Sequence, residues 1–347
     1  MLGLADAGQT ARLSGPRRFG KTTLLRKLLA DAAKRGIATV YVDLDRVVSL
    51  AGVSDRVEAA YRQQLQGPIQ RTAASVIRTL RPRAAAGAAG VRAEIAPQID
   101  EDARRMLGRM LDLPVDIFKK NGTRTLVAFD EFQDVLRIGG EVEGLIRSHI
   151  QHQTNEAAYV FAGSHPGFML ALFADRERPL FGQARPIALA PLEDAPLAEY
   201  IEARFEETGR HSGVALDELL RLARGHPQRA MLLAHHLWES TPTGATADLE
   251  TWTAVLDAVD RELGEGFERT WERLNTNEAR VLAALAVSDD TLFHQRTLAR
   301  FGLSKGGAEY GRDKLIEYGE VERQNGALMI VDPLLERWIR ITQRAED

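Results

Sequence analysis

The sequence predicts an α/β fold in which helices cover both faces of a parallel sheet. Three observations lead to this prediction. Short apolar segments alternate with helical segments, the first apolar segment leads into a glycine-rich turn and a helix, and a later one ends in two adjacent carboxylates. The 347 residues, of which 44% are hydrophobic and 27% charged, are enough for two or three domains with sizeable cores.

The composition excludes several classes of protein. The chain has no cysteine, which excludes disulfides and thiolate metal sites, and its 8 histidines lack the spacing of metal ligands. A net charge of −4 does not favour binding to nucleic acid through overall charge. No apolar run reaches the roughly 18 residues of a membrane span, and no signal peptide is recognised. We therefore expect a cytoplasmic protein without a membrane partner.

The first predicted strand covers residues 10–13 and leads into Gly-x-x-x-x-Gly-Lys-Thr, the phosphate-binding loop of nucleoside triphosphatases. Gly15 and Gly20 let the backbone curl so that successive N–H groups face phosphate oxygens. Lys21 supplies a positive charge for the β- and γ-phosphates, and the Thr22 hydroxyl is a ligand for Mg²⁺. The helix that follows directs the positive end of its dipole at the same phosphates. The candidate nucleotide-binding residues are Gly15, Pro16, Arg17, Arg18, Phe19, Gly20, Lys21, Thr22 and Thr23.

A second buried strand is predicted over residues 37–44, which are β-branched and apolar. Asp43 at its end either faces the nucleotide cleft or caps the next segment, and we favour the cap. Residues 46–80 have helical spacing. Residues 81–90 are rich in small residues, which indicates a loop, and residues 91–95 alternate like a short edge strand.

The second motif follows a predicted helix over residues 100–120. An apolar strand over residues 125–129 ends in Asp130 and Glu131. In phosphoryl transfer the first carboxylate holds the Mg²⁺ shell, and the second orients and polarises the attacking water. The alternative is an ordinary strand end with surface acids, but the phosphate loop upstream favours the catalytic interpretation. The adjacent pair also favours hydrolysis over simple nucleotide binding.

A third core strand is predicted over residues 158–163, after a helix over residues 144–151, and Ser164 ends it. Beside the acidic strand end, Ser164 either senses the γ-phosphate or caps the helix that begins at Pro166. The two interpretations have equal weight. Candidates for an arginine that reaches the nucleotide of a neighbouring subunit are Arg176, Arg178 and Arg185.

A final short strand over residues 186–192 marks a domain boundary. The next 80 or so residues are predominantly helical, and Arg229 lies on the first turns of a helix that opens with Gly-His-Pro, where it could reach the phosphates. From residue 275 the pattern is three helices and a β-hairpin with an Asn-Gly turn, which is typical of a winged helix-turn-helix. The predicted domains are a P-loop core over residues 1–192, a helical lid over 193–274 and a winged helix-turn-helix domain over 275–347.

The charge of the last domain bears on its partner. From residue 276 onward there are 2 Lys and 8 Arg against 12 Asp and Glu, a formal charge of about −2. The predicted third helix, residues 305–318, is neutral. A DNA-reading module is usually basic because phosphate contacts dominate affinity. The fold pattern therefore favours DNA, whereas the charge favours a protein partner.

Four strings together resemble one family, the prokaryotic archaeal-type ATPases of the AAA+/STAND grouping, which are related to the origin-recognition ATPases. These strings are Gly-Pro-Arg-Arg-Phe-Gly-Lys-Thr-Thr-Leu-Leu, Phe-Asp-Glu-Phe-Gln, Gly-His-Pro and Asp-Pro-Leu-Leu-Glu-Arg-Trp. The resemblance runs from residue 10 to about residue 340. It implies an AAA+-like P-loop NTPase core that binds ATP or ADP with Mg²⁺, a helical lid and a C-terminal winged helix.

The resemblance also assigns roles. Family members usually carry Gly-Arg-Glu and a helix ahead of the first strand, which help to hold adenine, whereas only about ten residues precede that strand here. Either the chain is truncated or the lid holds most of the base. The implied roles are Walker A for Lys21 and Thr22, Walker B for Asp130 and Glu131, sensor 1 for Ser164 and, as a looser match, sensor 2 for Arg229.

We therefore expect Mg²⁺-dependent ATP hydrolysis in which Glu131 positions water, coupled to movement of the lid and the winged helix. Two wider roles remain open. One is a nucleotide-switched protein that binds double-stranded DNA, akin to an initiator or loader. The other is a slowly hydrolysing STAND-type signalling switch or scaffold that binds a protein partner. The sequence does not decide between a monomer and a homo-oligomer.

Overall fold

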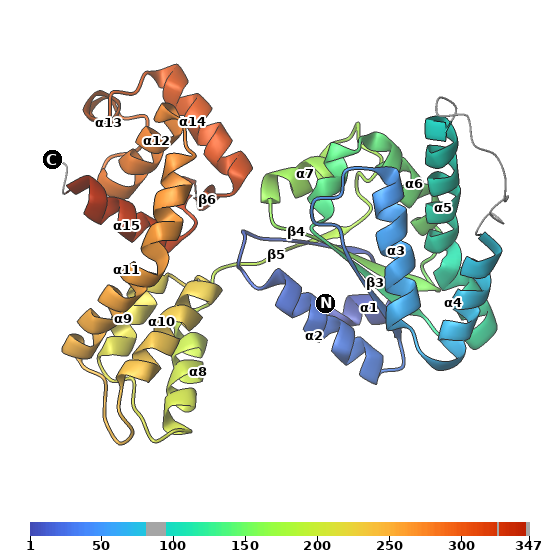
Figure 1. Ribbon diagram of the computed structural model, residues 1–347, viewed down its shortest axis with the longest axis horizontal. Coiled ribbons are helices and arrows are strands. Elements are labelled where there is room, and N and C mark those ends of the chain that lie inside the picture. Colours follow the sequence, from blue (N-terminus) through green and yellow to red (C-terminus); the bar gives the residue numbers. More distant parts are fainter. Residues whose placement is uncertain (81–94, 325, 345–347) are drawn as a thin grey trace. The chain divides into compact units, whose positions relative to one another are not determined.

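The computed structural model describes residues 1–80, 95–324 and 326–344. The chain divides into two compact units (Figure 1). The first comprises Met1–Gly15 and Lys21–Leu189, and the second comprises Pro16–Gly20 and Ala190–Asp347. The loop predicted over residues 81–90 and the edge strand predicted over 91–95 lie outside the described residues, except for Ile95, which begins a helix.

A five-stranded parallel sheet forms the centre of the first unit and confirms the predicted α/β class. The strand order is β2-β3-β4-β1-β5, so β4 separates β1, which precedes the phosphate loop, from β3, which precedes the paired carboxylates. Because the carboxyl ends of parallel strands meet at one edge, the residues after β1, β3 and β4 lie at the same edge of the sheet. The strands are β1 (Ala11–Ser14), β2 (Ala38–Asp43), β3 (Thr125–Asp130), β4 (Ala157–Gly163) and β5 (Arg185–Ala188).

Helices cover both faces of the sheet because successive side chains of a strand point to opposite faces. Leu126 and Ala128 of β3 belong to one hydrophobic core, and Val127 and Phe129 belong to another. Helices α1 (Leu2–Asp6) and α2 (Lys21–Lys34) contribute to the first core. The second core contains residues of α3 (Leu50–Gln64), α4 (Gly67–Leu80), α5 (Ile95–Asn121), α6 (Gly140–Ile150) and α7 (Pro166–Ala174).

The helical segment predicted over residues 46–80 is two helices in the structure. Ser49 caps α3, where its Oγ accepts a hydrogen bond from the Gly52 N–H at 3.1 Å. The chain leaves α3 at Leu65, whose backbone is extended, and Gly67 begins α4 with a φ of 60°. That left-handed conformation suits glycine, and it allows the sharp change of direction between the helices.

The second unit is mainly helical and has one continuous hydrophobic core. Buried residues from Leu197 to Ile339 belong to it, so the helices before residue 275 and the elements after it share a single interior. From α12 onward the structure has three helices, an antiparallel hairpin and a terminal helix, in the predicted order. The elements are α8 (Asp194–Glu206), α9 (Ala215–Ala223), α10 (Pro227–Ser240), α11 (Leu249–Glu272), α12 (Thr276–Val287), α13 (Gln295–Arg300), α14 (Lys305–Tyr318), β6 (Val321–Gln324), β7 (Ala327–Ile330) and α15 (Pro333–Arg344).

Within the described part of the chain, no helix combines the length and the apolar character needed to cross a membrane.

Candidate nucleotide-binding and catalytic site

The phosphate loop connects β1 to α2. Gly20 has a φ of 79°, a left-handed conformation that favours glycine. A Cβ on Gly15 would lie 3.0 Å from the Leu189 Cβ, so a larger residue there would force the chain after β5 to shift. Lys21 is buried, and its Nζ donates a hydrogen bond to the Gly15 carbonyl at 3.0 Å. Of the other predicted loop residues, Pro16 and Phe19 are buried, and Arg17, Arg18 and Thr23 are exposed.

Thr22 and Asp130 meet at the carboxyl edge of the sheet. The Thr22 Oγ1 donates to the Asp130 Oδ2 at 2.6 Å, although the two residues lie 108 positions apart. The other carboxylate oxygen, Oδ1, accepts a hydrogen bond from the Glu131 N–H at 3.0 Å. A hydroxyl and a carboxylate are oxygen ligands of the kind that Mg²⁺ prefers, so the pair fits this ion.

Tyr41 is a third member of this group that sequence reasoning missed. Its hydroxyl donates to the same Asp130 Oδ2 at 2.8 Å. Burial, the negative charge of Asp130 and this hydrogen bond raise the pKa of Tyr41, so the phenol stays protonated and remains a donor. In the sequence Tyr41 is one of several large residues in a buried strand. The available signal is its position two residues before the strand's carboxyl end.

Asp43 stabilises a turn and does not cap the next helix, because Ser49 is the N-cap of α3. Its Oδ1 accepts a hydrogen bond from the Asp45 N–H at 2.9 Å, which stabilises the turn after β2.

Glu131 and Ser164 also lie together at this edge, because β3 and β4 are neighbours. The Ser164 Oγ donates to the Glu131 Oε2 at 2.6 Å. The interpretation of Ser164 as a helix cap is wrong, because His165 occupies the N-cap position of α7. Gln133, buried in the 3-10 turn Phe132–Arg137, donates to the same Glu131 oxygen at 2.6 Å.

The backbone and the charge of Glu131 are both unusual. Its φ of 51° and ψ of 38° place a non-glycine residue in the left-handed region, which is a strained conformation that clusters at functional sites. Burial raises the pKa of Glu131, but hydrogen bonds from Ser164 and Gln133 and the charge of Lys21 together hold it below its usual value. Glu131 is therefore ionised near neutral pH.

Arg229 belongs to the second unit, in the first turn of α10, and is buried there. Its Nε donates to the Asp332 Oδ1 at 2.9 Å and to Oδ2 at 3.0 Å, and its Nη2 also contacts this carboxylate. His226 caps α10, where its Nδ1 accepts from the Arg229 N–H at 3.3 Å. Burial lowers the pKa of His226 to about 4, so the ring is neutral and can accept. The structure thus pairs Arg229 with a carboxylate, and its approach to phosphates stays a prediction.

The three candidate trans-acting arginines differ in their surroundings. Arg176 is exposed. Arg178 donates to the buried Glu143 Oε1 at 2.7 Å, so it has a structural partner. Arg185 begins β5 and therefore lies at the amino edge of the sheet.

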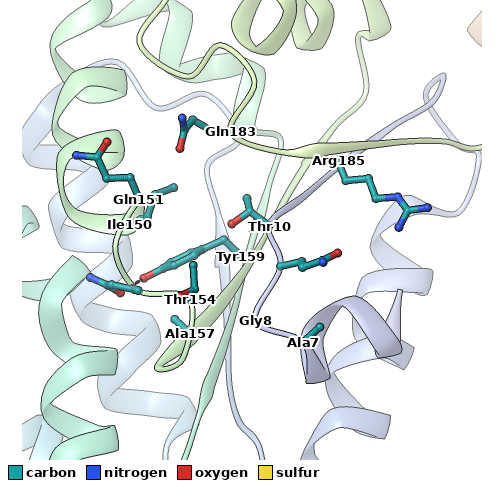
Figure 2. A pocket seen from close by; sticks show the side chains of 12 residues that line it. Ala7, Gly8, Thr10, Ile150, Gln151, Thr154, Ala157, Tyr159, Gln183 and Arg185 are labelled. Carbon is teal, nitrogen blue, oxygen red and sulfur yellow. Dashed lines mark hydrogen bonds between the residues drawn. The ribbon is translucent and has the colours of Figure 1, made fainter.

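A separate pocket of about 460 Å³ opens at that amino edge (Figure 2). Its lining comes from residues at the start of, or just before, β1, β4 and β5, so the pocket lies at the opposite end of the strands from Lys21 and Glu131. In Figure 2 the side chains of Gln151 and Gln183 lie on one side of it, and that of Arg185 lies on the other. The pocket is therefore separate from the candidate nucleotide site.

Comparisons with known proteins agree with the fold. No protein-family model matches the chain, and neither does any curated protein. A solved Walker-type ATPase of Pyrococcus abyssi is 16% identical and gives a TM-score of 0.67, over 95% of this chain and 91% of that one. The ORC2 protein of Aeropyrum pernix, solved as ADPNP–ADP complexes, is 16% identical and gives a TM-score of 0.55, over 97% of this chain and 88% of that one. The chain therefore shares the fold of these two solved structures.

Proposed function

We propose that this chain binds ATP with Mg²⁺ and hydrolyses it. The observation that carries the proposal is the 2.6 Å hydrogen bond between Thr22 and Asp130, because it joins the phosphate loop to the acidic strand end. A hydroxyl from the first turn of α2 and a carboxylate from the end of β3, beside a buried lysine and an ionised glutamate, supply the groups that phosphoryl transfer to water uses.

Each of these residues has a separate role in hydrolysis. Lys21 exchanges its contact with the Gly15 carbonyl for the β- and γ-phosphate oxygens. Thr22 and Asp130 hold Mg²⁺, which, when bound, neutralises charge on the phosphates. Glu131 orients the attacking water and accepts its proton, and Ser164 lies within reach of the same carboxylate.

The test measures ATP turnover and the affinity for a fluorescent ATP analogue in wild type and two variants. Lys21→Ala should abolish binding or turnover because the phosphates lose their positive partner. Glu131→Gln should keep wild-type affinity and lower turnover by at least about 100-fold, since the amide cannot accept the proton. Lys27→Ala, an exposed lysine on the same helix, is the matched control. Wild-type turnover in Glu131→Gln would show that another group is the base.

A nucleotide-switched DNA-binding role is a second candidate, favoured by the order of elements from α12 to α15. The charges of α14 weigh against it, because Arg312 pairs with Asp313 and Lys314 pairs with Glu317. Turnover measured with and without duplex DNA at two salt concentrations separates the roles. Salt-sensitive stimulation supports the DNA-binding role, and a rate indifferent to DNA supports a protein partner.

A further inference from the structure

The side chains of Glu131, Gln133 and Ser164 form a closed hydrogen-bonded ring. The Gln133 Nε2 donates to the Glu131 Oε2 at 2.6 Å and lies 3.4 Å from the Ser164 Oγ. The Gln133 Oε1 accepts a hydrogen bond from the Ser164 N–H at 3.2 Å. The ring is completed by the 2.6 Å bond from Ser164 to Glu131. Gln133 therefore joins the acidic end of β3 to the main chain that follows β4.

The primary amide of Gln133 makes both contacts because it carries a donor and an acceptor. One end of the Gln133 side chain must donate to a carboxylate, and the other must accept from a backbone N–H. A glutamate at this position could still accept from Ser164 but would place a second negative charge against Glu131. A leucine would fill similar space and make neither bond.

The surroundings of Gln133 leave it little freedom. The side chain is 4% exposed, and a Cβ on Gly163 would lie 2.7 Å from its Oε1. Gly163 therefore provides the space into which the amide fits. The left-handed turn at Glu131 lets the carboxylate and the amide, two residues apart, reach the same partner.

We propose that Gln133 is a positioning residue for hydrolysis, which rests on the function proposed above. Its amide donates a hydrogen bond to the Glu131 Oε2 and links that carboxylate to Ser164. The carboxylate is thereby held in one orientation, with Oε1 directed at the attacking water. If the main chain shifts at Ser164, the carboxylate of Glu131 shifts with it. A displacement of about 1 Å in a reacting group can lower the rate on the order of 100-fold.

The experiment compares kcat and the affinity for the fluorescent ATP analogue in the full chain and in Gln133→Leu and Gln133→Glu. Both variants should lower kcat by about 100-fold and leave the affinity unchanged, because Gln133 acts on the base and not on the phosphates. If Gln133→Leu does not fold, Gln133→Glu, which keeps the acceptor for Ser164, carries the test. Arg137→Gln, an exposed residue of the same 3-10 turn, is the control and should match wild type.

A double-mutant cycle distinguishes positioning from general damage. Added to Glu131→Gln, either change at Gln133 should cause no further loss, because the group that it positions is already inactive. A further loss of the same factor would overturn the proposal. Wild-type turnover in both Gln133 variants, with Glu131→Gln inactive, would also overturn the proposal for Gln133. The proposed ATPase function would be unaffected by that result. An inactive wild type would instead overturn the function itself, together with the role of Gln133.

Discussion

Asp130 has partners on both of its carboxylate oxygens before any metal is considered. Oδ1 is held by the Glu131 N–H, and Oδ2 is held by the hydroxyls of Thr22 and Tyr41. Groups that hold a metal ligand from outside the coordination sphere orient it, and their loss commonly weakens metal binding by 10-fold or more. Tyr41 is such a group for the proposed magnesium site.

Tyr41→Phe should therefore weaken the contribution of Mg²⁺ to nucleotide affinity by about 10-fold. The measurement is the affinity for a fluorescent ADP analogue over a Mg²⁺ titration and in EDTA. The EDTA value should stay at the wild-type level because the Tyr41 hydroxyl acts through its hydrogen bond to Asp130, the proposed magnesium ligand. Tyr310→Phe, an exposed tyrosine on α14, is the control. An unchanged Mg²⁺ dependence would mean that Thr22 and the backbone suffice to orient Asp130.

The sequence predicts the site residues whose chemistry follows from their own motif. Lys21, Thr22, Asp130 and Glu131 stand in short strings in which strand, turn and helix follow one another locally. Tyr41 is different, because its contact with Asp130 depends on the register between β2 and β3, which pairs Asp43 with Asp130. No local pattern specifies that register.

At the scale of elements, the last residue of β4, Gly163, leaves room for the side chains that pack beside the site. A Cβ on Gly163 would lie 2.4 Å from the Met169 Sδ and 2.7 Å from the Gln133 Oε1. The close approach of α7 and the 3-10 turn to this strand thus requires glycine. Gly167, in α7, has open space where its Cβ would be.

Gly163→Ala should destabilise the first unit by about 1–3 kcal/mol, because the added methyl group overpacks the strand end. It should also lower kcat, since Gln133 has to move. Gly167→Ala should be neutral or slightly stabilising in an open helical position. Urea denaturation followed by circular dichroism, with turnover measured in parallel, compares the two. Equal stabilities would show that Met169 and Gln133 adjust without cost.

The strands were predictable as elements because β3 and β4 are buried throughout and therefore read as continuous apolar runs. Two features were not. The division of residues 46–80 into α3 and α4 depends on the conformations of Leu65 and Gly67, within a helical pattern that continues across them. The short helix α1 has too few residues to show a period.

At the scale of the molecule, the second unit is tied together by a buried ion pair. Arg229 of α10 and Asp332, which precedes α15, lie 103 positions apart and on either side of the predicted boundary at residue 275. Asp332 also accepts from the Leu334 N–H at 3.0 Å. The pair therefore stabilises the junction between the helices before residue 275 and the terminal helix, and no sequence motif connects its two members.

Asp332→Asn should destabilise the second unit by about 3 kcal/mol, because it leaves the buried Arg229 guanidinium without a countercharge. Tryptophan fluorescence during urea unfolding reports on this unit alone, since all 4 tryptophans lie in it: Trp238, Trp252, Trp271 and Trp338. Glu265→Gln removes an exposed ion pair with Arg269 and should cost less than about 1 kcal/mol. A single transition is expected in all cases, because the core is continuous. Equal losses in the two variants would contradict the structural role of the Arg229–Asp332 pair.

The strand order has a consequence for how the protein is made. β1 leaves the ribosome before both of its neighbours in the sheet, because β4 and β5 follow it by more than 140 residues. Non-local pairing of this kind is slow, because a long loop has to close before any contact compensates for it. The phosphate loop is thus synthesised well before the two strands that hold β1 in the sheet. A nascent chain that stops before Ala157 lacks both strands beside which β1 lies in the sheet.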